Sequence, residues 1–283
     1  MPPANEQSAD PRAATTRILR WKQGALGQPA DDSLAREEPL EIRVKGESVA
    51  VTMRTPGHDE ELALGFLLSE GVIAGGGDVL EVAPCQQGEA ALHGNVLNVF
   101  LAPKVEIDLA KLRRNVYASS SCGLCGKASI ESVHGHFEPL AKREPLITAE
   151  TLLQLPDKLR AEQETFDKTG GLHAAGLFDA EGNLLTLRED VGRHNAVDKV
   201  LGRSMIDGNF PLENHVLMVS GRASFEIMQK ALAGRVPVIC AVSAPSSLAV
   251  EFAQESGQTL VGFLRGDTFN VYSHPERITG LGD

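Results

Sequence analysis

Short runs of alternating apolar and polar residues dominate the first hundred residues of the chain. They lie at residues 40–44, 49–53, 79–82 and 95–101. Alternation with a period of two is typical of strands that bury one face, so these runs predict strands. Between the second and third runs, Pro56-Gly57 predicts a turn, and the acidic residues 59–61 begin a helix that Gly71 ends.

In the second half of the chain, patterns typical of strands alternate with patterns typical of helices. Residues 149–165 carry leucines at helical spacing, and the runs 174–178 and 183–187 flank a turn and predict a hairpin. The further elements are helices at about 193–201, 223–233 and 246–256 and strands at 216–219, 236–242 and 259–264. Short apolar strands that alternate with helices indicate an α/β sheet whose faces are covered by helices.

These patterns divide the chain into a tail, a small subdomain, a loop and a larger domain. The expected bounds are a disordered tail at 1–16, a β-rich N-terminal subdomain with one helix at 17–115, a mobile loop at 116–135 and an α/β domain at 136–283. The predicted fold class is therefore α/β (α+β), with a mixed sheet that carries helices on its faces and a smaller β-rich subdomain.

Composition narrows the classes of function. The 283 residues carry a net charge of −11, which argues against a nucleic-acid binder because such proteins present basic surfaces. No apolar run approaches the ~20 residues that a membrane-spanning helix needs, and the N-terminus lacks the apolar core of a signal peptide. Four cysteines do not make a secreted disulfide framework. We therefore expect a cytoplasmic protein with reduced thiols and with neither nucleic acid nor membrane as a partner.

Two of the four cysteines form a Cys-x-x-Cys segment, Cys122 and Cys125, in a setting rich in glycine and serine. The first chemistry open to such a pair is half of a structural zinc site, which needs two further ligands. The candidates for them are Cys85, Cys240, His134 and His136. None of these forms a second ligand pair at the usual spacing, so zinc is a minority interpretation and no metal site is expected.

Two other chemistries remain for the pair. A thioredoxin-like redox site would lie between a strand at 115–118 and a helix at 127–133, although the chain is far longer than a thioredoxin unit. A persulfide carrier needs a mobile, nucleophilic thiol. Gly123 and Gly126 provide mobility, and the start of a helix at Lys127 would lower a thiol pKa. The spacing by itself does not select among the three.

Several junctions between strands and helices carry glycines, hydroxyls and basic side chains suited to an anion. They lie at 169–173, 188–195, 220–224, 243–247 and 265–267. The candidate contact residues are Gly171, His173, Arg193, Arg222 and Ser246. Each junction alone is explained by a turn, an N-cap or a surface ion pair. Together they favour a phosphorylated or nucleotide ligand outside the carboxyl ends of the strands.

The order hairpin, helix, strand, helix in the second half is that of zinc-dependent nucleoside deaminases. Those enzymes need a His-x-Glu segment on the first helix and a Pro-Cys-x-x-Cys segment at the second. The chain has His194-Asn195-Ala196 and, at 220–224, no cysteine. A deaminase-like fold without the zinc ligands and the general acid or base is therefore expected, and deaminase activity is not.

Six segments carry a resemblance to a known family. They are RTPGHDEELALGFLLSEGVI (54–73), SSSCGLCGKASI (119–130), TGGLHAAGLF (169–178), REDVGRHNAVDKVLG (188–202), SGRASFEIMQKAL (220–232) and SAPSSLAVEFA (243–253). In this order they resemble the FdhD family, whose members are sulfur carriers required for formate dehydrogenase activity. The resemblance extends from about residue 17 to residue 280.

The resemblance implies a function, a fold and partners. A family member is a sulfurtransferase that accepts sulfur from a cysteine desulfurase as a cysteine persulfide. It passes that sulfur to the molybdenum cofactor, in its bis-molybdopterin guanine dinucleotide form, before the cofactor enters the formate dehydrogenase catalytic subunit. A cytidine-deaminase-like domain and a homodimer are also implied. The alternatives are a non-catalytic chaperone that shields the cofactor, and a zinc or redox Cys-x-x-Cys module.

The resemblance also assigns site residues. The persulfide cysteine corresponds to Cys122, with Cys125 as its partner. The cofactor-binding stretch corresponds to Phe263, Leu264, Arg265, Gly266, Asp267 and Thr268. A guanine nucleotide is expected to mimic the cofactor at this stretch.

Overall fold

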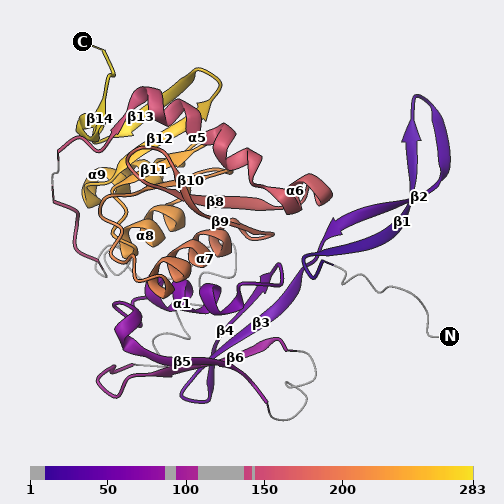
Figure 1. The fold of residues 1–283 in the computed structure, drawn as a ribbon, viewed down its shortest axis with the longest axis horizontal. Coiled ribbons are helices and arrows are strands. Elements are labelled where there is room, and N and C mark those ends of the chain that lie inside the picture. The colour runs from indigo at the N-terminus through magenta and orange to yellow at the C-terminus, as the bar shows by residue number, and fades with distance from the viewer. Residues whose placement is uncertain (1–9, 87–93, 108–136, 142–143, 283) are drawn as a thin grey trace.

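The structure, a computed structural model, describes residues 10–86, 94–107, 137–141 and 144–282. A four-stranded sheet from the first half of the chain and a six-stranded sheet from the second half lie on either side of a group of helices, and a long hairpin extends from their junction (Figure 1). The expected loop at 116–135, with Cys122, Cys125 and His134, and the neighbouring His136 lie outside the described residues.

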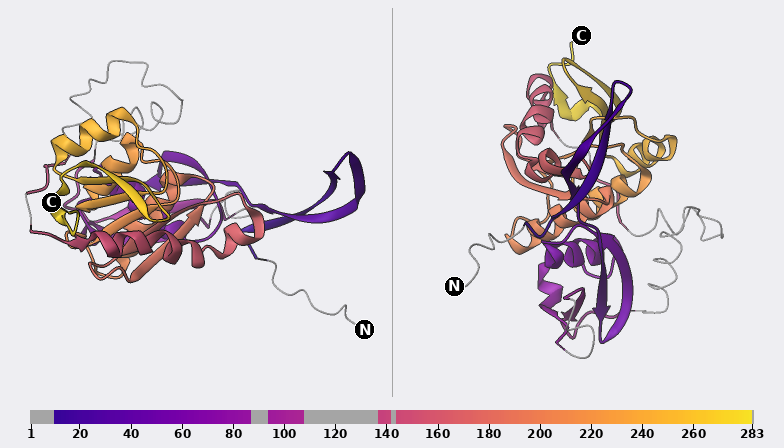
Figure 2. Two further views of the ribbon diagram at one scale, coloured as in Figure 1. Left: turned by 90° about the horizontal axis from the view of Figure 1, so that it is seen from above. Right: turned by 90° about the vertical axis from the view of Figure 1, so that its right-hand side faces the viewer.

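The hairpin consists of strands β1 (Ala13–Lys22) and β2 (Ala25–Ala35), which pair antiparallel. It points away from the rest of the molecule in two perpendicular views (Figures 1 and 2). Strand β1 begins at Ala13, so the last part of the segment expected to be a tail is ordered. The β-branched Thr15 and Thr16 favour an extended backbone, and Thr16 pairs with Asp32 of β2.

The four-stranded sheet has the order β4-β3-β6-β5. Its strands are β3 (Glu38–Val44), β4 (Glu47–Arg54), β5 (Val79–Pro84) and β6 (Val96–Leu101), and a short 3-10 helix, η1 (Gly76–Asp78), precedes β5. Strands β3 and β6 are parallel, and the other pairs are antiparallel. The predicted strands of this half are confirmed. Their inward residues, such as Leu40, Ile42 and Val99, are buried.

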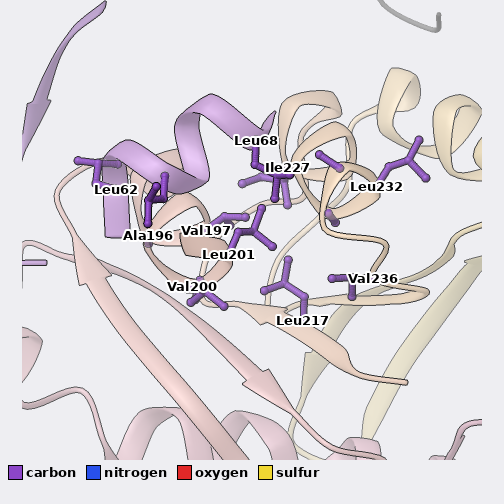
Figure 3. Packing of buried hydrophobic residues seen from close by; sticks show 14 of the residues in the cluster. Leu62, Leu68, Ala196, Val197, Val200, Leu201, Leu217, Ile227, Leu232 and Val236 are labelled. Carbon is purple, nitrogen blue, oxygen red and sulfur yellow. The ribbon is translucent and has the colours of Figure 1, made fainter. Parts of the chain in front are cut away.

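Helix α1 (Asp59–Ser69) is the element that joins the two halves. It is buried on nearly every side, because the four-stranded sheet covers one face (Figure 1) and helix α7 (Arg193–Ile206) covers another (Figure 3). The two helices cross with their backbones in close contact. Gly65 faces the Asp198 carbonyl, and Gly202 faces the Glu61 carbonyl, so neither position has room for a side chain.

The six-stranded sheet has the order β13-β12-β11-β10-β8-β9, with β10, β11 and β12 parallel. Its strands are β8 (His173–Phe178), β9 (Leu184–Asp190), β10 (Val216–Val219), β11 (Val238–Ala241), β12 (Thr259–Arg265) and β13 (Thr268–Ser273). A short pair, β7 (Ile147–Thr148) and β14 (Ile278–Thr279), and the 3-10 helix η2 (Pro275–Arg277) complete this half.

Helices cover both faces of this sheet, as the sequence predicts. Helices α7, α8 (Phe225–Ala233) and α9 (Ser247–Ser256) cover the face toward α1, and α5 (Ala149–Ala161) covers the other (Figure 1). The single helix predicted at 149–165 is wrong. The chain turns after α5 and starts α6 (Glu164–Thr169), because the Glu189 carboxylate accepts hydrogen bonds from two backbone N–H groups of its first turn.

Candidate functional site

The carboxyl edge of the six-stranded sheet collects most of the predicted anion-binding junctions. Strands β10, β11 and β12 are parallel, and β9 runs in the same direction because two antiparallel pairings separate it from β10. Helices α7, α8 and α9 follow β9, β10 and β11 directly, so all three begin at this edge. Helix N-termini present backbone N–H groups and a partial positive charge, which suits phosphate groups.

Backbone contacts join the loops along this edge into one wall. The Ser243 N–H donates to the Gly221 carbonyl at 3.4 Å, and the Ser246 N–H donates to the Ala223 carbonyl at 3.0 Å. The Phe263 N–H in turn donates to the Ser243 carbonyl at 3.2 Å. The loops after β10 and β11 and the end of β12 therefore form a continuous surface on which one ligand can lie.

His173 and Arg193 lie together at the β8 end of this wall. A Cβ atom on Gly221 would lie 3.5 Å from His173 Nδ1. Because residue 221 is glycine, no side chain stands between this loop and the imidazole. Burial, and secondarily the positive charge of Arg193, lower the pKa of His173. The Nε of Arg193 is buried and has no hydrogen-bond partner among the described residues. A buried unpaired donor is costly, and an anion at this position would satisfy it.

A second group of side chains stands beside Arg193. His194 Nε2 lies 3.2 Å from Ser224 Oγ, and His194 Nδ1 lies 3.2 Å from Glu226 Oε2. Burial, with the nearby charges of Arg193 and Lys230, lowers the pKa of His194 to about 3. The ring is therefore neutral at pH 7. Its Nδ1–H donates to the carboxylate, and its Nε2 accepts from the Ser224 hydroxyl. The Ser224 hydroxyl is therefore hydrogen-bonded to His194. Although Ser224 is the N-cap residue of α8, its side chain makes no capping hydrogen bond.

The neutral state of His194 predicts a dependence of stability on pH. The unfolded chain takes up a proton on this imidazole below pH 6.5, whereas the folded protein does so only near pH 3, so stability falls as the pH falls through this range. Between pH 7 and pH 5 the wild type should lose about 1–2 kcal/mol more of its free energy of unfolding than a His194→Gln variant. Urea unfolding at both pH values measures this difference. The same loss in both proteins would contradict it, and His58→Gln, at an exposed histidine, is the control.

Two buried ion pairs hold α7 at this edge. Lys199 Nζ lies 2.7 Å from Asp190 Oδ2, and both side chains are fully buried. The Asp190 carboxylate also accepts from the Thr55 N–H and from the Asn195 side chain, which ties the end of β4 to α7. The second ion pair lies one turn further along α7. There the Asp198 carboxylate accepts hydrogen bonds from the Lys230 ammonium group and from the Ser69 hydroxyl of α1. These contacts orient the start of α7, and with it Arg193, relative to the rest of the molecule.

The predicted stretch 263–268 forms the end of β12 and the turn to β13. Phe263 has a left-handed backbone with φ 53°, and the Arg265 guanidinium lies 5.7 Å from its ring centroid. Residues 265–268 are exposed, which leaves Arg265, Asp267 and Thr268 accessible to a ligand, and Gly266 has φ 59° in the turn. Leu264 departs from the expectation of a ligand contact. Its side chain is 0% exposed in the core under α5, because alternation along β12 points it inward, so only its backbone can contribute.

The three remaining predicted residues are distributed around the edge. Arg222 is exposed in the loop after β10. The Ser246 hydroxyl accepts from the Ala249 N–H at 3.2 Å, so this side chain acts as the N-cap of α9. Gly171 is exposed and lies against Ala35 at the base of the β1–β2 hairpin, just before β8 begins. Glu226 was not among the predicted residues, because an acidic side chain in the first turn of a helix is ordinary.

Of the candidate zinc ligands, the structure describes Cys85 and Cys240. Cys240 is 0% exposed in β11, and burial raises its thiol pKa. A thiol in that apolar core is not accessible as a ligand. Cys85 is half-buried at the end of β5. Within the ranges that the structure covers, no group of three or more His, Cys, Asp and Glu side chains is arranged to hold a metal ion. Over the same ranges, none of the helices has the length and apolar character to span a membrane.

The chain is similar to proteins of one family along most of its length. The model of the FdhD/NarQ family matches residues 35–279. A Streptomyces coelicolor protein named Sulfur carrier protein FdhD is 52% identical over 268 residues, which cover 93% of this chain and 94% of that protein. A Mycobacterium tuberculosis protein of the same name is 54% identical over 255 residues, which cover 88% and 92%.

A solved structure has the same architecture. It is a crystal structure of a protein from Desulfotalea psychrophila that is described as a formate dehydrogenase accessory protein. The TM-score is 0.76 at 26% sequence identity, and the match covers 95% of this chain and 100% of that chain. The predicted α/β fold class is confirmed by this likeness and by the two sheets described above.

Proposed function

Because the chain belongs to the FdhD/NarQ family, we propose that it is a sulfur carrier that supports formate dehydrogenase. The observation that carries the proposal is the similarity to named sulfur carriers over about nine-tenths of both chains. The Cys-x-x-Cys segment at residues 122–125 supplies the thiols that such a role needs. A reducing compartment such as the cytoplasm would keep those thiols available.

The first step is acceptance of sulfur from a cysteine desulfurase. The Cys122 thiolate attacks the terminal sulfur of the desulfurase persulfide. A new sulfur–sulfur bond forms on Cys122, and the bond to the desulfurase cysteine breaks, which leaves that cysteine as a thiolate. No external oxidant or reductant is consumed. Cys125 is assigned to the later release of the sulfur: its thiolate would attack the inner sulfur of the Cys122 persulfide, form a Cys122–Cys125 disulfide and free the outer sulfur as sulfide for the cofactor. A cellular thiol would then reduce the disulfide.

The second step is transfer of the sulfur to a molybdenum cofactor of the bis-molybdopterin guanine dinucleotide type, which is the substrate. Its phosphates need cationic and N–H donors. The carboxyl edge offers the first turns of three helices and Arg193, whose buried Nε has no hydrogen-bond partner in the part of the chain that the structure describes. Arg222 and Arg265 add exposed positive charges along the same wall. The loaded cofactor would then pass to the catalytic subunit of formate dehydrogenase.

Binding of GDP tests this edge as the ligand site. GDP carries the guanine and two phosphates of the cofactor, so the wild type should bind it. Arg193→Met should weaken binding by about tenfold or more, since a charge-assisted hydrogen bond to phosphate contributes about 1.5–3 kcal/mol. Isothermal titration calorimetry measures the affinity, with Arg160→Met, at an exposed arginine on α5, as the control. Unchanged affinity in Arg193→Met and in an Arg222→Ala/Arg265→Ala double variant would rule out this site.

The carrier role has a direct test. The purified protein is incubated with a cysteine desulfurase and cysteine, and its intact mass and cyanide-labile sulfur are measured. We expect a gain of one sulfur atom or more per chain. A chain that binds GDP but never gains sulfur would instead support the chaperone alternative. Stoichiometric zinc in the purified protein would support the metal-module alternative.

A further inference from the structure

Three side chains at the carboxyl edge of the six-stranded sheet make contacts that the sulfur-carrier role does not use. Ser224 Oγ lies 3.2 Å from His194 Nε2, and Glu226 Oε2 lies 3.2 Å from His194 Nδ1. The imidazole therefore lies between a hydroxyl and a carboxylate. A nucleophile, a base and a group that orients the base, connected in this order, make a catalytic triad on any fold. We call these three residues the serine triad.

Ser224 does not perform the structural role that its position suggests. A serine at the N-cap of a helix ordinarily accepts a hydrogen bond from the first turn, but the Ser224 hydroxyl does not. Ser246 has the same position at the start of α9, and its hydroxyl accepts from the Ala249 N–H. A cap and a side-chain hydrogen bond contribute similar free energies, so stability does not explain why Ser224 contacts His194 instead.

The imidazole of the triad is in the form that accepts a proton. Burial and the charges of Arg193 and Lys230 lower the pKa of His194, so the ring is neutral at pH 7. Because Nδ1–H donates to Glu226, the lone pair of Nε2 faces the Ser224 hydroxyl. Lys230 Nζ lies 3.9 Å from the other carboxylate oxygen of Glu226, which helps to fix that carboxylate. A base of low pKa is a weak base, so we expect a slow reaction.

The surroundings of Ser224 suit a negative charge that forms on a substrate. Ser224 lies at the first turn of α8, whose backbone N–H groups have no partner within the helix. Such N–H groups can stabilise the oxyanion of a tetrahedral intermediate. Arg193 precedes His194, and its buried Nε has no hydrogen-bond partner within the described ranges, so it can bind an anionic group of the same substrate. All three triad residues are half-buried, so a small molecule can reach them.

We propose that Ser224, His194 and Glu226 form a hydrolase site for small carboxylic esters or thioesters that carry an anionic group. Ser224 Oγ bonds to the carbonyl carbon while its proton passes to His194 Nε2. The bond to the alcohol or thiol then breaks, and this leaving group takes the proton from the imidazolium. Water attacks the acyl-serine in the same way, with His194 again as the base, and releases the acid. Glu226 is a positioning residue that orients the imidazole.

This activity goes beyond the sulfur-carrier proposal and does not depend on it. It uses neither cysteine of the Cys-x-x-Cys segment, and it needs no oxidant, reductant or co-reactant other than water. The reaction can therefore be present or absent whether or not the chain carries sulfur.

A fluorophosphonate tests for the activated serine, because it bonds to a serine that a neighbouring base activates and stays attached. The wild type should gain one phosphonyl group per chain by intact mass, and peptide mapping should find it on Ser224. Since the label accumulates with time, a slow site is also detected. Ser246→Ala, at the capping serine of α9, should be labelled like the wild type, and Ser224→Ala should not. A wild type that gains no label, or gains it on another residue, would overturn the proposal.

The rate of labelling tests the other two members of the triad. His194→Gln should lower it by about a hundredfold or more, because the base is lost. Glu226→Gln should lower it by about tenfold or more, and Glu226→Asp should restore part of the rate, because a carboxylate again orients the ring. Circular dichroism checks that the variants fold. If folded His194→Gln is labelled as fast as the wild type, the hydroxyl is not activated by this histidine and the triad has only a structural role.

Two esters test the class of substrate. The wild type should hydrolyse 4-nitrophenyl hydrogen succinate, which carries a carboxylate, faster than the neutral 4-nitrophenyl acetate. Arg193→Met should remove this preference. The rates of Ser224→Ala are subtracted, because thiols also react with such esters. Equal rates for the two esters in the wild type would contradict an anionic substrate.

Discussion

Replacement of Cys122 by alanine should abolish the gain of sulfur from a cysteine desulfurase. A persulfide needs a thiolate to receive the sulfur, and alanine offers no nucleophile, so the loss should be complete rather than partial. Intact mass and cyanide-labile sulfur measure the outcome after incubation with desulfurase and cysteine. We expect formate dehydrogenase matured with this variant to be inactive as well, because the cofactor would receive no sulfur.

Three further cysteine variants complete this experiment. Cys85→Ala removes a half-buried thiol outside the Cys-x-x-Cys segment and should load sulfur like the wild type. Cys125→Ala should still accept sulfur on Cys122 but release it more slowly. If Cys122→Ala gains as much sulfur as the wild type, the assignment of this cysteine is wrong. If a Cys122→Ala/Cys125→Ala variant still yields active formate dehydrogenase, the chaperone alternative is favoured.

Replacement of Gly65 or Gly202 by alanine should destabilise the protein strongly. A Cβ atom at either position would overlap the backbone carbonyl of the facing helix, Asp198 or Glu61, so α1 and α7 must move apart. Overpacking of this kind costs about 1–3 kcal/mol or more, against a gain of at most ~1 kcal/mol in helix propensity. The separation would also loosen the buried contact between Asp198 and Ser69, so we expect a net loss of about 2–4 kcal/mol in the free energy of unfolding.

Urea unfolding of the variants tests this expectation. The control is Gly77→Ala, since an added Cβ there meets no atom within 4 Å and its backbone is not left-handed. That variant should stay within about 0.5 kcal/mol of the wild type. Because α7 carries Arg193, the Gly202→Ala variant should also lose affinity for GDP. An unfolding midpoint for Gly65→Ala at or above that of the wild type would show that the helices tolerate separation.

The secondary structure was largely predictable because its signals are local. The residues of β3, β4, β5 and β6 alternate between apolar and polar, and this period can be recognised within each strand without knowledge of its neighbours. The exceptions had causes outside the segment concerned. The break between α5 and α6 depends on the carboxylate of Glu189, which comes from a distant strand. Strand β13 was not predicted, although Phe269 and Val271 alternate along it and pack against the core, and it pairs antiparallel with β12.

In the candidate site, too, the local features were predictable and the contacts between distant segments were not. Glycines, hydroxyls and arginines at the ends of strands were visible in the sequence, and the rule that parallel strands end at one edge placed several junctions together. The sequence did not reveal that His194 is held between Ser224 and Glu226, because these residues come from two helices and are brought together only by packing. It also did not reveal that Leu264, within a stretch expected to bind a ligand, points into the core.

By itself, then, the sequence determined the α/β class, the family and the pair of thiols, since each of these depends on the order and periodicity of residues along the chain. The tertiary structure alone decided that α1 packs between the four-stranded sheet and α7, that Asp190 meets Thr55 across 135 positions, and that the buried Nε of Arg193 has no hydrogen-bond partner among the described residues. It also decided that Trp21 is 67% exposed within its own chain. The reason is physical: burial and charge pairing depend on which distant segments meet, and that is a property of packing.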